Sequence, residues 1–432
     1  MRQVLFYVPD QFLGIPVFGW GWLLLLWSIA VAISLAVLWR RQRRDEIWGT
    51  LPVIVLIAAA ILFLLPRLEA QAPDGRILGL PIRGYGTMLL VGILAGLGLT
   101  VHLARRVSID RETIFSLAFW MFIGGIAGGR ALYVGLNWDD FRRESVTATA
   151  VEIAKFTEGG LVVFGALAGG LVAFFLFTRV HRQPRLLLAD VIAPGLALGL
   201  ALGRIGCLFN GCCFGGECHG PLAIEFPRYT CVPQQVLSPP YAHQLSLGRL
   251  HGIRLGPGTS GAVVTEVDPV GAADKAGVRR GMPIAAVNGI PASDLATVQK
   301  VLLRSGAEVA LRDAGGDVFS WRIAVLPSRS LPVHPTQVYS AVDGAVLCFF
   351  LWCLFPLRPV NGVVFASEMT IHPVTRFLLE VIRDDEPGRW GTALTISQLI
   401  SLLTLVLVCG LWVYLWRHPD VAALPPQSRA QE

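Results

Sequence analysis

Long apolar stretches alternate with short polar segments along most of the chain. A transmembrane helix needs about 20 apolar residues to cross about 30 Å of hydrocarbon. Stretches that meet or approach this length predict membrane spans at about residues 17–39, 49–66, 85–104, 114–136, 159–178, 187–208, 336–357, 361–382 and 394–416. The second stretch is short, and polar residues interrupt the eighth. The pattern predicts a polytopic α-helical membrane protein with about nine spans.

The composition agrees with a membrane protein. Of the 432 residues, 54% are hydrophobic and 15% are charged, whereas soluble domains carry about 25% charged residues. The net charge of +6 lies largely in short basic clusters beside apolar runs, which indicates topology signals. We therefore expect no nucleic-acid partner. The first apolar run is long and is followed by no A-x-A-type site, so no cleavable signal peptide is expected.

Basic clusters predict the orientation of the chain. Lys and Arg are enriched in short cytoplasmic loops. Under the predicted spans, the clusters at 40–44, 104–111 and 178–185 and the terminal "LWRH" fall on one side, and the segment 137–158 falls on the other. We expect an extracytoplasmic N-terminus and a cytoplasmic C-terminus.

A polar segment of different texture separates the sixth and seventh spans. "AVVTEV" alternates as a strand, Asn288-Gly289 is typical of a tight turn, and "DLATVQKVLLRS" has a helical period. This order, with the run "ADKAGVRRGMPIAAVNG", resembles a PDZ domain of the bacterial periplasmic-protease type over residues 246–328. PDZ domains take C-terminal peptides as an added strand. The segment is thus expected to be a small extracytoplasmic α+β domain that captures C-terminal peptides of exported proteins or, alternatively, serves as a packing or docking module.

Charged residues inside the eighth span are the first functional signal. Charged groups in a membrane are costly and by default mark function or tight pairing. Glu368, His372, Arg376 and Glu380 are spaced by four and form one stripe on a helix, over roughly 18 Å of depth. Such a stripe lines a polar cavity or pairs with neighbouring helices. A buried Arg–Glu pair that fixes helix packing is the alternative.

Other polar residues are predicted near the same outer level. Arg204 lies in the sixth span, Arg130 in the fourth, Tyr85 opens the third, Asn210 follows the sixth, and His334 precedes the seventh. Arginine matches phosphate through bidentate hydrogen bonds. A phosphate at that depth belongs most naturally to a phospholipid headgroup. These residues predict an enzyme or carrier that acts on lipid headgroups.

Six motifs then point to a family. They are, in order, "IRGYGTMLLVG" (82–92), "GGRALYVG" (128–135), "GGLVVFGALAGG" (159–170), "GRIGCLFNGCCFG" (203–215), "HPTQVYSAVDG" (334–344) and "RFLLEVIRDDE" (376–386). Together they resemble the prolipoprotein diacylglyceryl transferase family. The resemblance implies a seven-span core in the bacterial cytoplasmic membrane that moves diacylglyceryl from phosphatidylglycerol to the lipobox cysteine of prolipoprotein signal peptides. It implies no cofactor and no metal.

The resemblance also divides the chain. The expected parts are two additional N-terminal spans (1–79), the first part of the transferase-like core (80–245), the PDZ-like domain (246–328), the second part of the core (329–417) and a cytoplasmic tail (418–432).

The family's signature, approximately G-R-x-G-N-x-x-N-G-E-x-x-G, implies the candidate site residues. The expected catalytic set is Arg204, Arg376, Glu380, His334 and Tyr85, and the expected substrate-binding set is Arg130, Asn210, Gly203, Gly206, Gly215 and His372. Arg204 and Arg376 would neutralise the phosphate as glycerol-1-phosphate leaves, because electrostatic stabilisation grows where water is excluded. The attacking lipobox thiol must lose a proton, and His334 or His372 would accept it.

Four positions depart from the family pattern. Cys207 and Cys212 replace the first asparagine and the glutamate of the signature, Phe164 replaces a histidine, and His372 stands where a tyrosine is usual. Phe164, Cys207 and Cys212 favour an alternative function, a catalytically weakened paralogue that acts as a membrane-anchored lipid- or peptide-binding adaptor.

Cysteines cluster on the predicted outer side. They are Cys207, Cys212, Cys213, Cys218 and Cys231, whereas Cys348, Cys353 and Cys409 lie in spans as apolar fillers. Clustered extracytoplasmic cysteines favour disulfides. A metal site in "CCFGGECH" with His219 is a second interpretation, and a membrane thiol oxidoreductase is a third.

Overall fold

The computed structural model describes residues 3–40, 44–72, 74–142, 145–154, 162–231, 235–258, 261–383, 392 and 394–418. The chain forms two compact units. The first unit contains the chain up to Met88, Ile205–Val338 and a short piece from Ile382. The second unit contains Leu89–Arg204, Tyr339–Val381 and the C-terminal helix. Because the unit boundaries fall within long helices, several helices contribute to both units.

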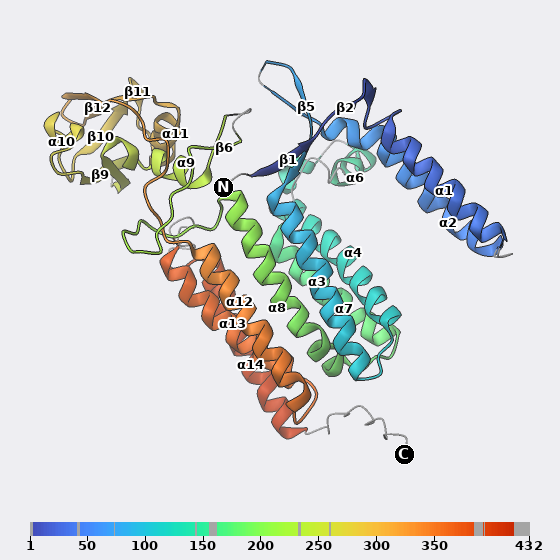
Figure 1. The fold of residues 1–432 in the computed structure, drawn as a ribbon. Coiled ribbons are helices and arrows are strands. Elements are labelled where there is room, and N and C mark those ends of the chain that lie inside the picture. Colours follow the sequence, from blue (N-terminus) through green and yellow to red (C-terminus); the bar gives the residue numbers. More distant parts are fainter. Residues whose placement is uncertain are drawn as a thin grey trace. The chain divides into compact units, whose positions relative to one another are not determined.

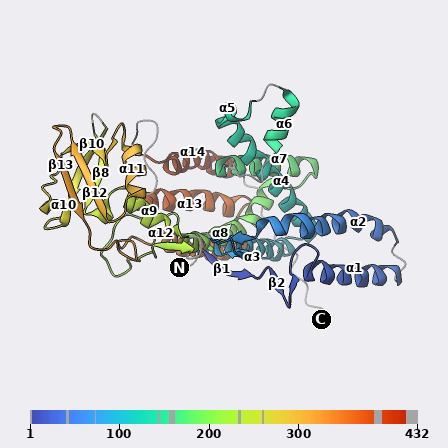
Figure 2. The ribbon, with the colours of Figure 1, turned by 90° about the horizontal axis from the view of Figure 1, so that it is seen from above.

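The second unit is helical (Figure 1). Its helices are α3 (Gly84–Arg106), α4 (Arg111–Leu136), α5 (Trp138–Phe141), α6 (Val146–Ala154), α7 (Val163–Val180), α8 (Arg185–Asn210), α12 (Thr336–Leu354), η5 (Phe355–Leu357), α13 (Val363–Ile382) and α14 (Ile396–Arg417). Helices α12, α13 and α14 lie side by side (Figures 1 and 2). Leu103, Leu117, Phe177, Leu188 and Leu351, each at most 1% exposed, belong to the core that joins α3, α4, α7, α8 and α12.

Glycines set the closest helix contacts of the second unit. A Cβ at Gly169 of α7 would lie 2.1 Å from the carbonyl oxygen of Gly124 on α4, and a Cβ at Gly128 would lie 2.4 Å from that of Gly165. Small residues four apart allow helix backbones to approach in a membrane, where apolar burial alone gives little driving force. Gly165 and Gly169 of the run "GGLVVFGALAGG" therefore allow the close α4–α7 contact.

The N-terminal part of the first unit begins with strands and continues with two helices. The elements are β1 (Val4–Val8), β2 (Gln11–Phe12), β3 (Ile15–Pro16), α1 (Trp22–Arg40), α2 (Arg44–Ala59), η1 (Ala60–Leu64), η2 (Leu65–Leu68), β4 (Ala70–Gln71) and β5 (Ile77–Arg83). The sheet order is β1-β5-β4. Helix α1 buries none of its residues, so its apolar surface is available to lipid.

Eight helices in the described part of the chain are long and apolar enough to cross a membrane. They match eight of the nine predicted spans within a few residues, the second of them at Thr50–Leu68. The remaining predicted span, 361–382, forms α13, whose charged stripe keeps it outside this set. The prediction of a polytopic helical membrane protein is confirmed, and the ninth span stays a prediction.

The segment between α8 and α12 folds as a small α+β body in the first unit. Its elements are β6 (Tyr229–Cys231), β7 (Val236–Leu237), α9 (Pro239–Ser246), η4 (Arg249–His251), β8 (Ile253–Gly258), β9 (Gly261–Val267), α10 (Ala272–Lys275), β10 (Pro283–Val287), β11 (Ile290–Pro291), α11 (Leu295–Arg304), β12 (Glu308–Asp313) and β13 (Val318–Arg322). The main sheet is antiparallel, in the order β13-β12-β10-β9-β8, with β11 paired to β10.

Local sequence signals explain this body. The predicted tight turn is present: Asn288 and Gly289 have positive φ (47° and 79°) between paired Val287 and Ile290, as a two-residue hairpin turn requires. Asp294 caps α11 by accepting a 2.6 Å hydrogen bond from Thr297 N. The core lies between α11 and the sheet. The resemblance to a PDZ domain stays a prediction.

Candidate active site

A pocket of the second unit lies between α8, α12 and α13. It is lined by Leu200 and Arg204 of α8, Ser340, Asp343 and Gly344 of α12, and His372, Arg376 and Leu379 of α13. Three of these residues, Arg204, His372 and Arg376, were predicted as site residues. A Cβ on Gly344 would lie 3.1 Å from the Cα of Ala201, so glycine lets α12 approach α8 beside the pocket.

Arg376 is held by both α13 and α14. Its Nη1 lies 2.7 Å from Oε2 of Glu380, one turn later on the same helix. Its Nη2 donates a 3.0 Å hydrogen bond to Oγ of Ser397. Glu380 is 2% exposed and also accepts from Oγ1 of Thr395, the N-cap of α14, at 3.3 Å. The guanidinium thus meets the pocket in a fixed orientation and with its charge partly balanced.

The predicted polar stripe of α13 faces the protein interior. Glu368 and Glu380 are each 2% exposed, and His372 and Arg376 line the pocket. The stripe agrees with both interpretations of the sequence. It contains a buried Arg–Glu pair, and it also lines a polar pocket.

Asp343 is a pocket residue that sequence reasoning missed. Its Oδ2 accepts a 2.9 Å hydrogen bond from Oγ1 of Thr375 on α13. Asp343 shares the pocket lining with Arg204, His372 and Arg376. A carboxylate in the eighth position of an apolar span was the available signal, since charged residues in spans mark function by default.

Arg130 does not belong to this pocket lining. Its guanidinium donates to the carbonyl oxygens of Ile153 (2.8 Å from Nε) and Glu152 (3.1 Å from Nη2), which end α6. It also lies over the ring of Phe141, 5.1 Å from the centroid. Cations near helix C-termini satisfy the last carbonyls, so this contact ties α4 to α6. The predicted role of Arg130 in substrate binding stays a prediction.

The signature residues of the first unit form the turn that follows α8. Thr336 Oγ1 donates to the carbonyl oxygen of Cys213 at 2.5 Å, and Gln337 Nε2 donates to that of Cys212 at 2.7 Å. Gly215 N donates to the carbonyl oxygen of His334 at 3.0 Å. A Cβ on Gly215 would lie 2.6 Å from the Cβ of His334, which explains glycine at this signature position.

The start of α3 packs against the end of α8 in the same unit. A Cβ on Gly206 would lie 3.2 Å from both the Cδ2 and the carbonyl oxygen of Tyr85. Asn210 Oδ1 accepts a 2.6 Å hydrogen bond from Nε2 of Gln3. By contrast, a Cβ on Gly203, which belongs to the second unit, would meet nothing within 4 Å. Packing therefore explains glycine at 206 and 215 but not at 203.

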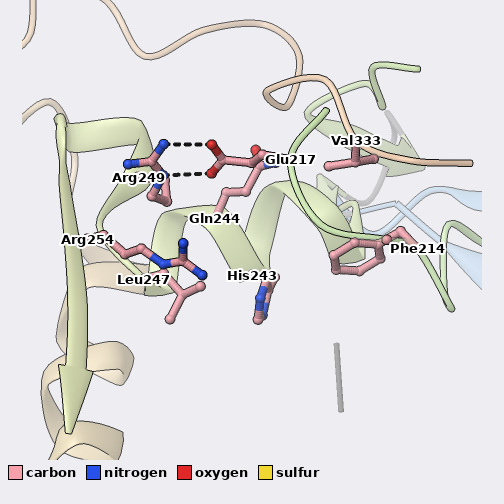
Figure 3. A pocket seen from close by; sticks show the side chains of 9 residues that line it. Phe214, Glu217, His243, Gln244, Leu247, Arg249, Arg254 and Val333 are labelled. Carbon is pink, nitrogen blue, oxygen red and sulfur yellow. Dashed lines mark hydrogen bonds and ion pairs between the residues drawn. The ribbon is translucent and has the colours of Figure 1, made fainter. Parts of the chain in front are cut away.

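A second pocket borders the turn after α8 (Figure 3). It is lined by Phe214, Gly215, Glu217, His243, Gln244, Leu247, Arg249, Arg254 and Val333. Arg249 and Glu217 form a bidentate pair with two 2.6 Å contacts. Hydrogen bonding to Glu217 raises the pKa of Arg249. The pair ties the turn after α8 to η4, at the entrance of the α+β body.

All eight cysteines are free thiols in the structure, so the predicted disulfide clamp is not formed. The Sγ atoms of Cys207, Cys212 and Cys213 instead lie within 4.8 Å of one another. Cys231 contacts the hydroxyl of Tyr7 at 3.1 Å, and burial together with this contact raises the pKa of Tyr7 to about 12.

Comparison with known proteins identifies the family. The model of the family described as prolipoprotein diacylglyceryl transferase matches residues 76–416. The chain belongs to the prolipoprotein diacylglyceryl transferase family. The resemblance predicted from the six motifs is thereby confirmed. With its apolar helices, this family member is a multi-pass membrane protein.

Three relatives similar to this family member are each named phosphatidylglycerol–prolipoprotein diacylglyceryl transferase. The protein of Rhodopirellula baltica is 34% identical over 97% of this chain and 90% of its own length. That of Clostridium tetani is 24% identical over 78% of this chain and 93% of its length. That of Synechococcus elongatus is 38% identical over 34% of this chain and 50% of its length.

Proposed function

We propose that this family member transfers diacylglyceryl from phosphatidylglycerol to the lipobox cysteine of prolipoproteins and releases glycerol-1-phosphate. One observation carries the proposal beyond family membership: two arginines, a histidine and an aspartate line one pocket between helices. Arginine forks bind phosphate oxygens well, and a pocket inside a membrane protein suits a phospholipid headgroup.

The two pocket arginines hold the phosphate in this proposal. Arg376, oriented by Glu380 and Ser397, and Arg204 of α8 neutralise the charge that develops on the leaving phosphate. Electrostatic stabilisation of this kind is strong because the groups are fixed before the reaction and water is excluded. Glu380 acts as a positioning residue, since its contacts are to Arg376 and Thr395.

His372 accepts the proton of the lipobox thiol. The thiolate is the nucleophile of cysteine, and imidazole is the commonest general base. Of the two predicted bases, His372 lines the pocket, whereas His334 exchanges backbone hydrogen bonds with Gly215 and Gly216. Asp343 of α12 lines the same pocket, and its carboxylate balances the positive charge of the imidazole once that has taken up the proton. The predicted roles of Tyr85 and His334 in catalysis and of Arg130, Asn210 and Gly203 in substrate binding stay proposals.

The membrane arrangement is also a proposal. We infer a bacterial cytoplasmic (inner) membrane protein in which α13 is a ninth span, the N-terminus is extracytoplasmic and the C-terminus is cytoplasmic. Basic clusters at 104–111 and 178–185 on one side support this orientation. The interior-facing stripe of α13 supports a span whose polar face is hidden from lipid.

The body over residues 246–328 is proposed to be a PDZ-like extracytoplasmic domain. Strand β8 is an edge of its sheet, and an edge strand can accept an extended peptide by strand addition. C-terminal peptides of exported proteins are the expected ligands. The Arg249–Glu217 ion pair equally supports a docking role, because it joins this body to the turn that follows α8.

Purified full-length protein, phosphatidylglycerol and a lipobox peptide test the function, with diacylglyceryl-peptide followed by mass spectrometry. Product that disappears in Arg204→Ala and Arg376→Ala but persists in Arg106→Ala, an exposed arginine at the end of α3, supports the transferase. No product with intact phosphatidylglycerol binding would favour the alternative, the weakened paralogue that Phe164, Cys207 and Cys212 suggest.

A further inference from the structure

Three thiols converge at the end of α8, where Cys207 lies in the last turn of the helix and Cys212 and Cys213 lie in the turn that follows. The Sγ atoms of Cys207, Cys212 and Cys213 lie within 4.8 Å of one another, and all three residues are half-buried. Among the described residues this is the one group of three or more histidine, cysteine, aspartate or glutamate side chains with such geometry. Zinc–sulfur bonds of about 2.3 Å in a tetrahedron place sulfur atoms somewhat under 4 Å apart. The thiols therefore need only small side-chain shifts to share one ion.

The backbone that carries the thiols is fixed independently of them. Thr336 and Gln337, which are 1% and 0% exposed, hold the carbonyl oxygens of Cys213 and Cys212 from α12. The turn itself runs through Gly211 at φ 77°. Supporting hydrogen bonds that orient ligands are a regular part of metal sites. The three sulfurs are thus presented together on a rigid turn.

We propose that Cys207, Cys212 and Cys213 bind one Zn²⁺ as thiolates and leave its fourth position open for the lipobox thiol. The role of the fourth position rests on the proposed transferase function. Zinc with three protein ligands and one open position is the arrangement of catalytic sites, and thiolate ligands suit zinc. This proposal differs from the prediction of no metal that the family resemblance implied. It also differs from the predicted metal site in "CCFGGECH", because His219 is not among the ligands.

The chemistry explains what such a site contributes. A thiol that coordinates a metal is deprotonated, so the lipobox cysteine would be a thiolate at neutral pH. Its proton is released to water when the thiol binds the metal. The sulfur forms a bond to the glyceryl carbon, the bond between that carbon and the phosphate oxygen breaks, and its electron pair leaves on glycerol-1-phosphate. Zinc stays Zn²⁺ throughout, and the neutral thioether product is a weaker ligand than a thiolate. Phe164, at the start of α7, stands where the family pattern has a histidine, and its phenyl ring cannot accept a proton.

Metal content of the full-length protein, purified without chelator, is the first test. The expected result is about one zinc per chain, falling at least fivefold in Cys207→Ser and in Cys212→Ser. Cys353→Ser is the matched control, because Cys353 is exposed on α12, outside the trio, and it should keep the zinc. Unchanged zinc in the two trio variants, or a disulfide among the trio in unreduced peptide maps, overturns the proposal.

Cobalt(II) exchanged for zinc tests the open position. Sulfur-to-cobalt charge-transfer bands should appear in the near ultraviolet, and a lipobox peptide should shift the visible bands whereas the same peptide with serine for cysteine should not. Visible bands that shift with neither peptide would show that the lipobox thiol does not bind at the open position of the metal, and this result overturns the proposed substrate role of that position. Failure of the two proposals is distinguishable. Product formed at an equal rate by zinc-free Cys212→Ser removes the role of the zinc in the reaction alone, and bound zinc with a shifted cobalt spectrum but no product removes the transferase function alone.

Discussion

Arg376 and Glu380 form an ion pair of 2.7 Å one turn apart on α13, with the Glu380 side chain fully buried and that of Arg376 15% exposed. Arg376 reaches the pocket, and Glu380 does not line it. A buried pair is costly to break, because removal of one partner leaves the other charge without compensation. The pair therefore links the proposed phosphate-binding function to the stability of the contact between α13 and α14.

Arg376→Ala is expected to lower kcat/KM by about 10²- to 10³-fold, the usual loss when one stabilising donor is removed. Arg376→Lys should recover only part of this, because a lysine cannot reproduce the two directed contacts to Glu380 and Ser397. Steady-state assays of diacylglyceryl-peptide formation measure both. Wild-type rates in a correctly folded Arg376→Ala protein would remove this pocket from the mechanism.

Asp343→Asn should reduce kcat by about 10- to 100-fold while KM for phosphatidylglycerol changes little, because a positioning residue acts through the general base. Thr375→Val removes the hydroxyl that donates to Asp343 and should cost less, since the carboxylate remains. The assay needs separate kcat and KM values for both variants. A larger loss in Thr375→Val than in Asp343→Asn would contradict the assignment.

The sequence predicted the membrane helices well because an apolar run of sufficient length has few other uses. It also predicted the Asn288-Gly289 turn and the polar stripe of α13, which depend on local spacing. Asp343 was missed because its importance arises from α8 and α13, far away in the chain. The contact of Arg130 with the end of α6 and the meeting of three thiols around the turn after α8 likewise depend on tertiary packing. The local periodicity of a sequence does not show which distant residues come into contact in the folded chain.

Gly169→Ala is expected to destabilise the α4–α7 contact, since its Cβ would lie 2.1 Å from a backbone oxygen of Gly124. Overpacking of this kind usually costs about 1–3 kcal/mol. Gly135→Ala is the matched control, because a Cβ there would meet nothing within 4 Å. Thermal unfolding of both variants in the same detergent should show a lowered midpoint for Gly169→Ala alone; equal midpoints would mean that α4 and α7 pack less closely.

The Arg249–Glu217 pair should couple the signature turn to the α+β body. Both side chains are partly exposed, 15% and 26%, so solvent screening limits the coupling to about 1 kcal/mol. A double-mutant cycle with Arg249→Ala and Glu217→Ala, read from thermal or denaturant unfolding, isolates this term. Strictly additive effects would show that the pair contributes nothing to attachment. Arg312→Ala, on β12, serves as an arginine control within the same body.

His251 should make the α+β body sensitive to acid. It is 1% exposed, its Nε2 lies 3.0 Å from the carbonyl oxygen of Gly306, and its backbone carbonyl accepts from Nε1 of Trp321. Burial lowers the pKa of His251 below its usual value. The unfolded chain therefore binds a proton near pH 6.5 while the folded body still excludes it, so stability is full above about pH 6.5 and falls as the pH drops, by at most about 1.4 kcal/mol per pH unit.

Hydrogen exchange of core amides such as those of Val264 and Leu311, corrected for the intrinsic pH dependence, measures this loss of stability in the full-length protein. His251→Gln keeps a donor for Gly306 and should flatten the response, whereas His219→Gln, at an exposed position, should leave it unchanged. A wild-type body equally protected at pH 7.5 and 5.5 would show that the buried imidazole is already compensated.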